Sequence, residues 1–283
     1  LNDTYTSEVR PGDHERESAA ANRFVGAITR EQAFNPALAA GRRWLKEQPQ
    51  LPGGQRLIDL FAYGRRIIRD VAKEIFALPE GFLSDADNHA DPGEGVRCPF
   101  DLTTAFLHVF PPRPSKAVSD QAVEAGATIR AAAEAFVSKP ENREELEKGA
   151  FIHALRQYND YGDETDEARP ERELRTLLGV LSGFAVPTNG HLVSVLVQLA
   201  SSGGLWRLQR ELDPVLRRLE REAAVKGEVH EYPPLSSEHV QFLYEPLYGC
   251  MIRAAVPERI QRTAVADTTL AGVELKHGDL LAV

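Results

Sequence analysis

The sequence predicts a mainly α-helical domain with a small β-sheet near its C-terminus. Most of the chain places apolar residues three and four positions apart, which is the spacing of amphipathic helices, and the period changes to two after Pro257. One stretch, residues 171–202, would form a helix of roughly 45 Å at 1.5 Å per residue. We therefore expect helices arranged around one very long central helix, followed by a minor sheet.

Four helices are expected before the central one. The first begins at Asn35-Pro36, because an Asn cap followed by Pro suits the start of a helix. The second runs from Leu57 to Ile75 and ends at Leu78-Pro79, since the residue before a proline disfavours the helical conformation. The third and fourth cover residues 117–137, which are rich in alanine, and residues 143–158.

The central helix is predicted to be buried in protein, and no membrane span is expected. Residues that would be costly inside a bilayer interrupt its apolar run, namely Pro187, Thr188, Asn189, His191 and Gln198. A charged amphipathic surface helix follows at residues 205–224, and another runs from a cap at Ser236 or Ser237 towards Arg253.

Three short strands are expected after Pro257, at residues 262–266, 272–275 and 280–283. Residues 276–279, Lys-His-Gly-Asp, predict a tight turn between the last two strands. The final apolar run resembles an unfinished strand, the chain opens at Leu1, and its only methionine is Met251. We therefore expect a single domain over residues 1–283 that is incomplete at both ends.

Composition narrows the function classes. A formal net charge of −9 argues against nucleic-acid binding, which needs clustered Lys and Arg. The two cysteines, Cys98 and Cys250, lie far apart in the sequence and imply no disulfide framework, so a cytoplasmic location is expected.

The order of elements, together with three segments, resembles the middle of a cytochrome P-450. The segments are residues 262–283 (RTAVADTTLAGVELKHGDLLAV), residues 60–80, which end FALPE, and residues 12–16 (GDHER). The resemblance implies haem b as cofactor. It assigns four residues to haem binding. His14, Arg16 and Arg262 would contact the haem propionates, and Arg253 would be the Arg of the helix that precedes the strands.

The central helix departs from the family pattern. Where the family carries an acid and an alcohol that relay protons to bound dioxygen, this sequence has Ala185 and Val186, which cannot relay protons. The chain is similar in this respect to P-450 relatives that rearrange fatty-acid hydroperoxides, whose substrate already contains an oxygen–oxygen bond. The resemblance makes Asn189 the residue that steers the reactive oxygen. It places Thr188 and His191 beside Asn189 as catalytic residues, and Phe184 and Val186 in the substrate pocket.

Two further departures concern the Arg helix and the haem ligand. The family's Glu-x-x-Arg aligns either with Glu245 to Tyr248 or with Cys250 to Arg253, and the second alignment keeps a more natural distance to Arg262. The cysteine that ligates the iron is expected beyond Val283. Cys98 precedes the central helix, so it does not fit the ligand loop, and Cys250 is interpreted as a small buried apolar residue.

The expected activity is therefore isomerisation or dehydration of an apolar, lipid-like hydroperoxide, with a dioxygenase as a possible fused or separate partner. Two alternatives remain: an ordinary P-450 monooxygenase, and a haem-free domain that acts as a scaffold or partner surface. Residues 187–190 also suit a simple helix kink. Residues 159–167 resemble a magnesium motif of terpene cyclases, although a solvated acidic loop is the favoured interpretation there and at residues 85–91.

Overall fold

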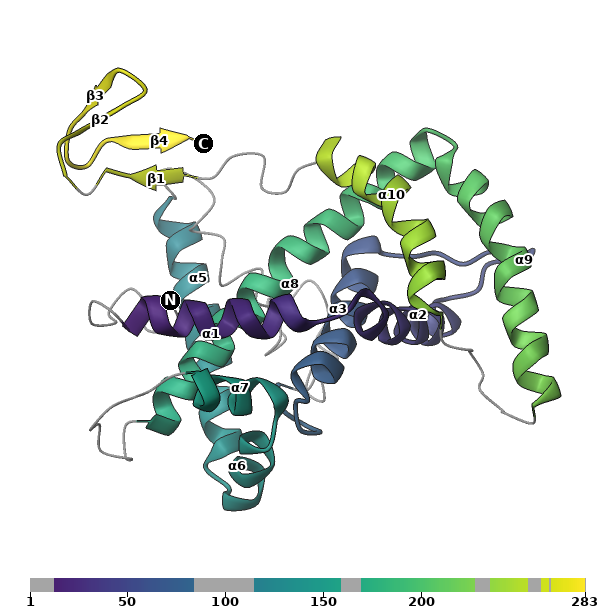
Figure 1. The fold of residues 1–283 in the computed structure, drawn as a ribbon, viewed down its shortest axis with the longest axis horizontal. Helices are drawn as coiled ribbons and strands as arrows, with labels where there is room; N and C mark the ends of the chain where they lie inside the picture. The colour runs from purple at the N-terminus through teal and green to yellow at the C-terminus, as the bar shows by residue number, and fades with distance from the viewer. Residues whose placement is uncertain are drawn as a thin grey trace.

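The computed structural model describes residues 13–83, 115–158, 169–226, 235–253, 261–264 and 266–282. These residues form a mainly helical structure with two small antiparallel sheets near the C-terminus (Figure 1), which confirms the predicted fold class at this level. The helices are α1 (Asp13–Ala27), α2 (Arg30–Glu47), α3 (Leu60–Phe76), α5 (Lys116–Val137), α6 (Pro140–Glu147), α7 (Ala150–Tyr158), α8 (Arg169–Ser201), α9 (Gly204–Val225) and α10 (Ser237–Arg253). The strands are β1 (Gln261–Thr263), β2 (Thr268–Leu270), β3 (Val273–Leu275) and β4 (Leu280–Ala282).

The 33-residue helix α8 is the central element, as the sequence predicts. It runs across the molecule in Figure 1 and contacts α3, α7, α9 and α10 along its length. By length and composition alone α8 could also cross a membrane, and 33% of its most apolar window is buried in the protein. Because the central helix of a folded domain passes the same test, this is weak evidence for a membrane span.

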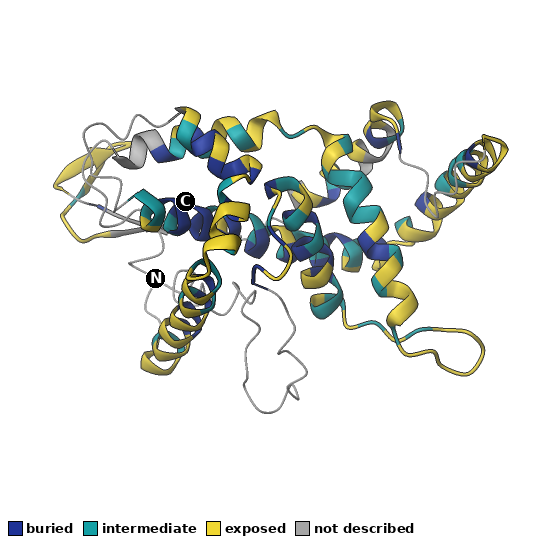
Figure 2. Cartoon of the chain, turned by 90° about the horizontal axis from the view of Figure 1, so that it is seen from below, coloured by how far each residue is buried: buried dark blue, intermediate teal, exposed yellow. Residues whose placement is uncertain are grey.

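The largest hydrophobic cluster surrounds the N-terminal half of α8. Leu177 and Leu181 of α8 are fully buried together with Phe76 of α3 and with Phe151 and Leu155 of α7. Figure 2 shows these buried segments in the middle of the molecule, with exposed helix faces around them. Burial of this apolar surface fixes α8 between α3 and α7.

Helix α2 begins earlier than the sequence predicted. It starts at Arg30, because Thr29 and Gln32 form a reciprocal capping box, and Pro36 lies inside the helix. Asn35 is therefore not a cap. Its side chain accepts a hydrogen bond from Leu235 N (2.7 Å) and donates one to Leu235 O (3.3 Å), which connects α2 to the segment that enters α10.

The prediction of a single helix over residues 143–158 was wrong, because the structure has two short helices there, α6 and α7. The chain turns at Gly149, where a Cβ atom would lie only 2.9 Å from Leu146 O and 3.1 Å from Ala77 O. Close approach of backbone from two segments thus requires glycine at the junction. The expected helices over residues 117–137 and 205–224 are confirmed as α5 and α9.

The sequence analysis did not specify how the strands pair. The tight turn at residues 276–279 exists, with Gly278 at a φ of 90° and Asp279 N bonded to Lys276 O (2.9 Å), but the strands on its two sides do not pair with each other. Instead β1 pairs with β4, and β3 pairs with β2, a strand that the sequence analysis missed.

Candidate functional site

Asn189 is the most unusual residue of α8, because it is a buried amide in the contact between two helices. Its side chain is 4% exposed and faces Gly64 of α3, so closely that a Cβ atom at Gly64 would overlap Asn189 Oδ1. Among the residues that the structure describes, Asn189 Oδ1 has no hydrogen-bond partner. A buried polar atom without a partner costs about 1–3 kcal/mol, so this position is unfavourable for stability alone.

Pro187 lies inside α8, and its neighbours bond back to the helix. The Thr188 hydroxyl donates a hydrogen bond to Phe184 O. His191 Nδ1 lies 3.0 Å from Pro187 O, and because a carbonyl oxygen can only accept a hydrogen bond, Nδ1 is the donor. Thr188 is exposed and His191 is half-buried. These local bonds are those expected of a helix that continues through a proline.

The three residues predicted to be catalytic do not converge. Successive residues of a helix are about 100° apart around its axis, so Asn189 and His191 are separated by about 200°. Thr188 and His191 are about 60° apart around the axis of α8, whereas Asn189, about 100° from Thr188, faces α3. The structure therefore brings Asn189 alone into a buried polar position.

The two residues predicted to line a substrate pocket lie in hydrophobic clusters. Phe184 is half-buried, and its ring centroid lies 5.8 Å from that of Phe76. Val186 is 7% exposed and belongs to the main core. Both side chains stabilise the fold in this structure, and neither lines a described cavity.

A cleft of about 970 Å³ opens near Phe184, between α1, α2, α3 and the start of α7. Its walls are mainly apolar and include Phe24 and Ile75, and Ile75 packs against the same hydrophobic cluster as Phe184. Two carboxylates also line it, Glu31 and Glu74, and the Ser237 hydroxyl donates to Glu31 (2.9 Å). The volume is within the range of small-molecule sites, but no predicted site residue lines this cleft.

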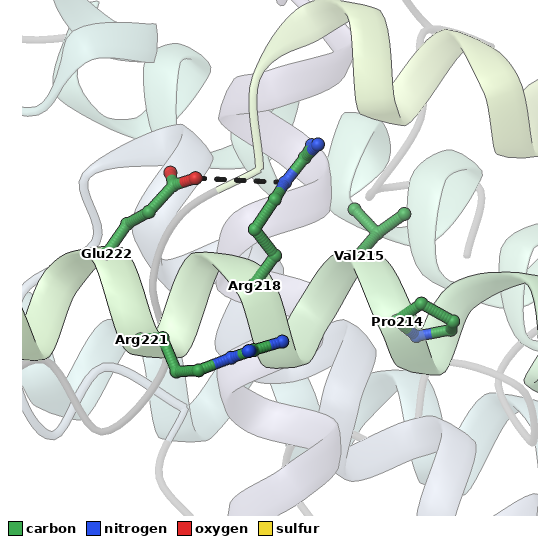
Figure 3. A pocket seen from close by; sticks show the side chains of 5 residues that line it. All are labelled: Pro214, Val215, Arg218, Arg221 and Glu222. Atoms are coloured by element: carbon green, nitrogen blue, oxygen red, sulfur yellow. Dashed lines mark ion pairs between the residues drawn. The ribbon is translucent and has the colours of Figure 1, made fainter.

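A second hollow of about 490 Å³ lies on α9 (Figure 3). Arg218 and Glu222, which form an ion pair at 3.8 Å, project from one side of the helix, and Arg221 projects from the other. Both members of the pair are more than half exposed. We interpret this hollow as a solvated helix face, because its side chains do not converge on an enclosed space.

Two buried ion pairs at the N-terminal part of α8 were missed by the sequence analysis. Arg156 of α7 donates to both carboxylate oxygens of Glu173 (2.7 and 2.8 Å), and Arg175 lies 3.6 Å from Glu17 of α1. Hydrogen bonding to Glu173 raises the pKa of Arg156 above its ordinary value, with a smaller contribution from Glu147. Glu173 and Glu17 are 3% and 2% exposed, so these pairs fix α7 and α1 against α8.

The structure describes the backbone but not the side chains of the four residues predicted to bind haem. His14 and Arg16 are on the first turns of α1, Arg253 ends α10, and Arg262 is in β1, where it pairs with Leu281. Cys98 and the two acidic loops also lie outside the described residues, and the side chain of Glu245 is not described. Cys250 is 6% exposed and packs against Val195, Leu199 and Leu208, as expected for a buried apolar residue.

The described residues contain no cluster of three or more His, Cys, Asp or Glu side chains that could hold a metal ion. What the described residues offer chemically is therefore a single buried amide on the central helix and a separate, mainly apolar cleft. In comparisons with known proteins, no family model matches this chain, and no curated protein matches it either.

Proposed function

We propose that this chain is part of a P-450-type haem-thiolate enzyme that isomerises or dehydrates a lipid-like hydroperoxide in the cytoplasm. When bound, haem b supplies the cleavage of the oxygen–oxygen bond. The chain supplies the central helix, with Asn189 as the residue that orients the oxygen atoms of the substrate. A dioxygenase, fused or separate, would provide the hydroperoxide.

The buried amide of Asn189 is the observation that carries the proposal. An unpaired Oδ1 in the α3–α8 contact lowers stability, and groups of this kind are concentrated at functional sites. An amide can donate to a hydroperoxide oxygen and accept from its hydroxyl. Gly64 leaves room for the Asn189 amide in the α3–α8 contact, and a substrate would have to reach the amide there.

The other chain residues support the proposal in a more limited way. Ala185 and Val186 are both buried and carry no exchangeable proton, so they favour a substrate that brings its own oxygen–oxygen bond over dioxygen activation. Among the described residues, Cys250 is the only thiol, and it lies in an apolar cluster. The described part thus fits the substrate side of such a site and lacks the thiolate, which would come from outside it.

The proposal is tested by turnover of a polyunsaturated fatty-acid hydroperoxide under anaerobic conditions and without a reductase. We expect the purified enzyme to consume the hydroperoxide and release an isomer or a dehydrated product. Asn189→Leu is expected to abolish or redirect this reaction while haem absorbance is unchanged. Thr188→Val, at an exposed position of α8 about 100° around the helix axis from Asn189, is the matched control and should retain activity.

Consumption only in the presence of dioxygen and a reductase would instead identify a monooxygenase. A haem-free scaffold is the second candidate, and one observation favours it: the predicted site residues of α8 line neither of the two hollows found among the described residues. An absorbance spectrum without any haem band would support this candidate and contradict the proposed enzyme.

A further inference from the structure

The mainly apolar cleft between α1, α2, α3 and the start of α7 has about 970 Å³ of space that the proposed haem chemistry does not use. One wall is the ring of Phe24, which packs against Phe76 (centroids 5.3 Å apart) and edge-on against Phe151 (5.2 Å). Ile28 and Ile75 also line the cleft. Because Phe24 packs against the main hydrophobic cluster, this wall is preformed for an apolar ligand of small-molecule size.

The charged side chains that line the cleft are acidic. Among the described residues they are Glu31 of α2, which is half-buried, and Glu74 of α3, which is exposed, and the described lining contains no Lys or Arg. Within the described part of the chain, no Lys, Arg or His side chain forms an ion pair with either carboxylate. The guanidinium of Arg30, next to Glu31 in the chain, instead lies over the Tyr244 ring of α10, 4.0 Å from its centroid. The described walls therefore carry two negative charges that no described cation balances.

The neutral amides of the lining already bond to the backbone. The Asn35 side chain accepts from Leu235 N and donates to Leu235 O, and Gln32 Oε1 accepts from the backbone N–H of Thr29 (2.8 Å). Glu31 Oε2 accepts one hydrogen bond from α10, whereas Glu31 Oε1 accepts none from the described residues. The charged groups that remain for a ligand are thus carboxylate oxygens, which only accept hydrogen bonds.

We infer that this cleft binds a small organic cation, namely a protonated primary amine on an aromatic or alkyl body. The ammonium group would donate to the carboxylates that line the cleft, and the body would lie against Phe24 and Ile75, out of water. Charge complementarity identifies this class of ligand, because a neutral molecule gains no ionic interaction there and an anion is repelled. The inference is independent of the proposed enzyme activity, since Asn189 does not line the cleft.

Three probes of similar shape and different charge test the inference by isothermal titration calorimetry and ligand-observed NMR. They are phenethylamine, which is protonated at neutral pH, phenethyl alcohol, which is neutral, and hydrocinnamate, which is an anion. Phenethylamine should bind with an affinity at least about tenfold higher than that of the alcohol, because its hydrogen bonds to the carboxylates are charge-assisted. Its affinity should fall as salt rises, and hydrocinnamate should not bind.

Two variants separate the charge of the cleft from its shape. Glu31→Gln/Glu74→Gln removes both charges at nearly constant volume, so it should weaken phenethylamine by about tenfold or more and leave the alcohol within twofold. Ala39→Trp places a large side chain at an exposed position of α2 that lines the cleft, so it should abolish binding of both molecules while the carboxylates are unchanged. Far-ultraviolet circular dichroism checks that each variant is folded.

The double variant Glu144→Gln/Glu211→Gln is the matched control. It makes the same charge change at two exposed positions, in α6 and α9, that do not line the cleft, and it should bind phenethylamine within twofold of the unchanged protein. The inference is overturned if phenethylamine does not bind at millimolar concentration, if the alcohol binds as tightly, or if the control weakens binding as much as Glu31→Gln/Glu74→Gln. It is also overturned if Glu31→Gln/Glu74→Gln instead abolishes self-association in sedimentation velocity, since a second copy would then cover the cleft.

Discussion

Replacing Gly64 with alanine tests the α3–α8 contact that places Asn189. In an exposed helix interior, glycine to alanine stabilises by about 0.5–1 kcal/mol, because alanine loses less backbone entropy on folding. At Gly64 the added Cβ would overlap Asn189 Oδ1 and lie 3.3 Å from Leu192 Cδ2. Overpacking of a buried contact costs about 1–3 kcal/mol, so Gly64→Ala should be destabilising overall by about 1–2 kcal/mol.

Asn189→Ala removes the atom that the new methyl group would meet. It also removes the unpaired Oδ1, so its own cost should be smaller than that of an ordinary truncation in a core. In the Asn189→Ala background, Gly64→Ala should become neutral or slightly stabilising. The two changes are therefore expected to couple by at least about 1 kcal/mol in a double-mutant cycle.

The assay is urea unfolding followed by far-ultraviolet circular dichroism, with the midpoints of the four proteins compared at constant slope. Gly183→Ala is the control, since Gly183 lies in α8 with nothing within 4 Å of a built Cβ, and it should stabilise. The reasoning is refuted if Gly64→Ala stabilises as Gly183→Ala does, or if Asn189→Ala leaves the cost of Gly64→Ala unchanged.

Three other predictions follow from the described contacts. Arg156→Met should lower the free energy of unfolding by about 2–3 kcal/mol in urea titrations, because it removes both hydrogen bonds from Arg156 to the buried Glu173 carboxylate and leaves it the longer ion pair with Arg169 (3.6 Å); adding Glu173→Leu should recover most of the loss. Tyr63→Phe should cost about 1 kcal/mol in the same assay, since it removes the 2.8 Å bond from the Tyr63 hydroxyl to Gly41 O that joins α3 to α2. The His277 N–H and Lys276 lower the pKa of Asp267 below its ordinary value of 3.8, so the turn they form should be intact above that pH and loosen as pH falls through the lowered pKa. A lower protection factor of the His277 amide in acid, and in Asp267→Asn at neutral pH, is the expected readout, and equal protection in both proteins would contradict it.

The helical part of the fold could be predicted because its signals are local. The apolar spacing of residues 171–202 and the charged period of residues 205–224 both depend only on neighbouring residues, and α8 and α9 match them closely. The start of α2 was misplaced because Asn35-Pro36 and the Thr29–Gln32 capping box are competing local signals, and the capping box prevails.

The site could not be predicted to the same degree, because it depends on contacts between distant segments. The sequence singles out Asn189 in the long helix, but which side of α8 faces α3 follows from tertiary packing against Gly64. The pairing of β1 with β4 joins residues some 20 positions apart, and the turn between β3 and β4 gives no sign of it. The buried Arg156–Glu173 pair likewise joins α7 to α8, and no local pattern marks it.

The absorbance spectrum of the purified full-length protein, reduced and exposed to carbon monoxide, tests the proposed function most directly. The proposal predicts a shifted Soret band of the thiolate type in both the unchanged protein and Asn189→Leu, with hydroperoxide turnover impaired only in the variant. A flat visible spectrum from correctly folded protein would contradict it.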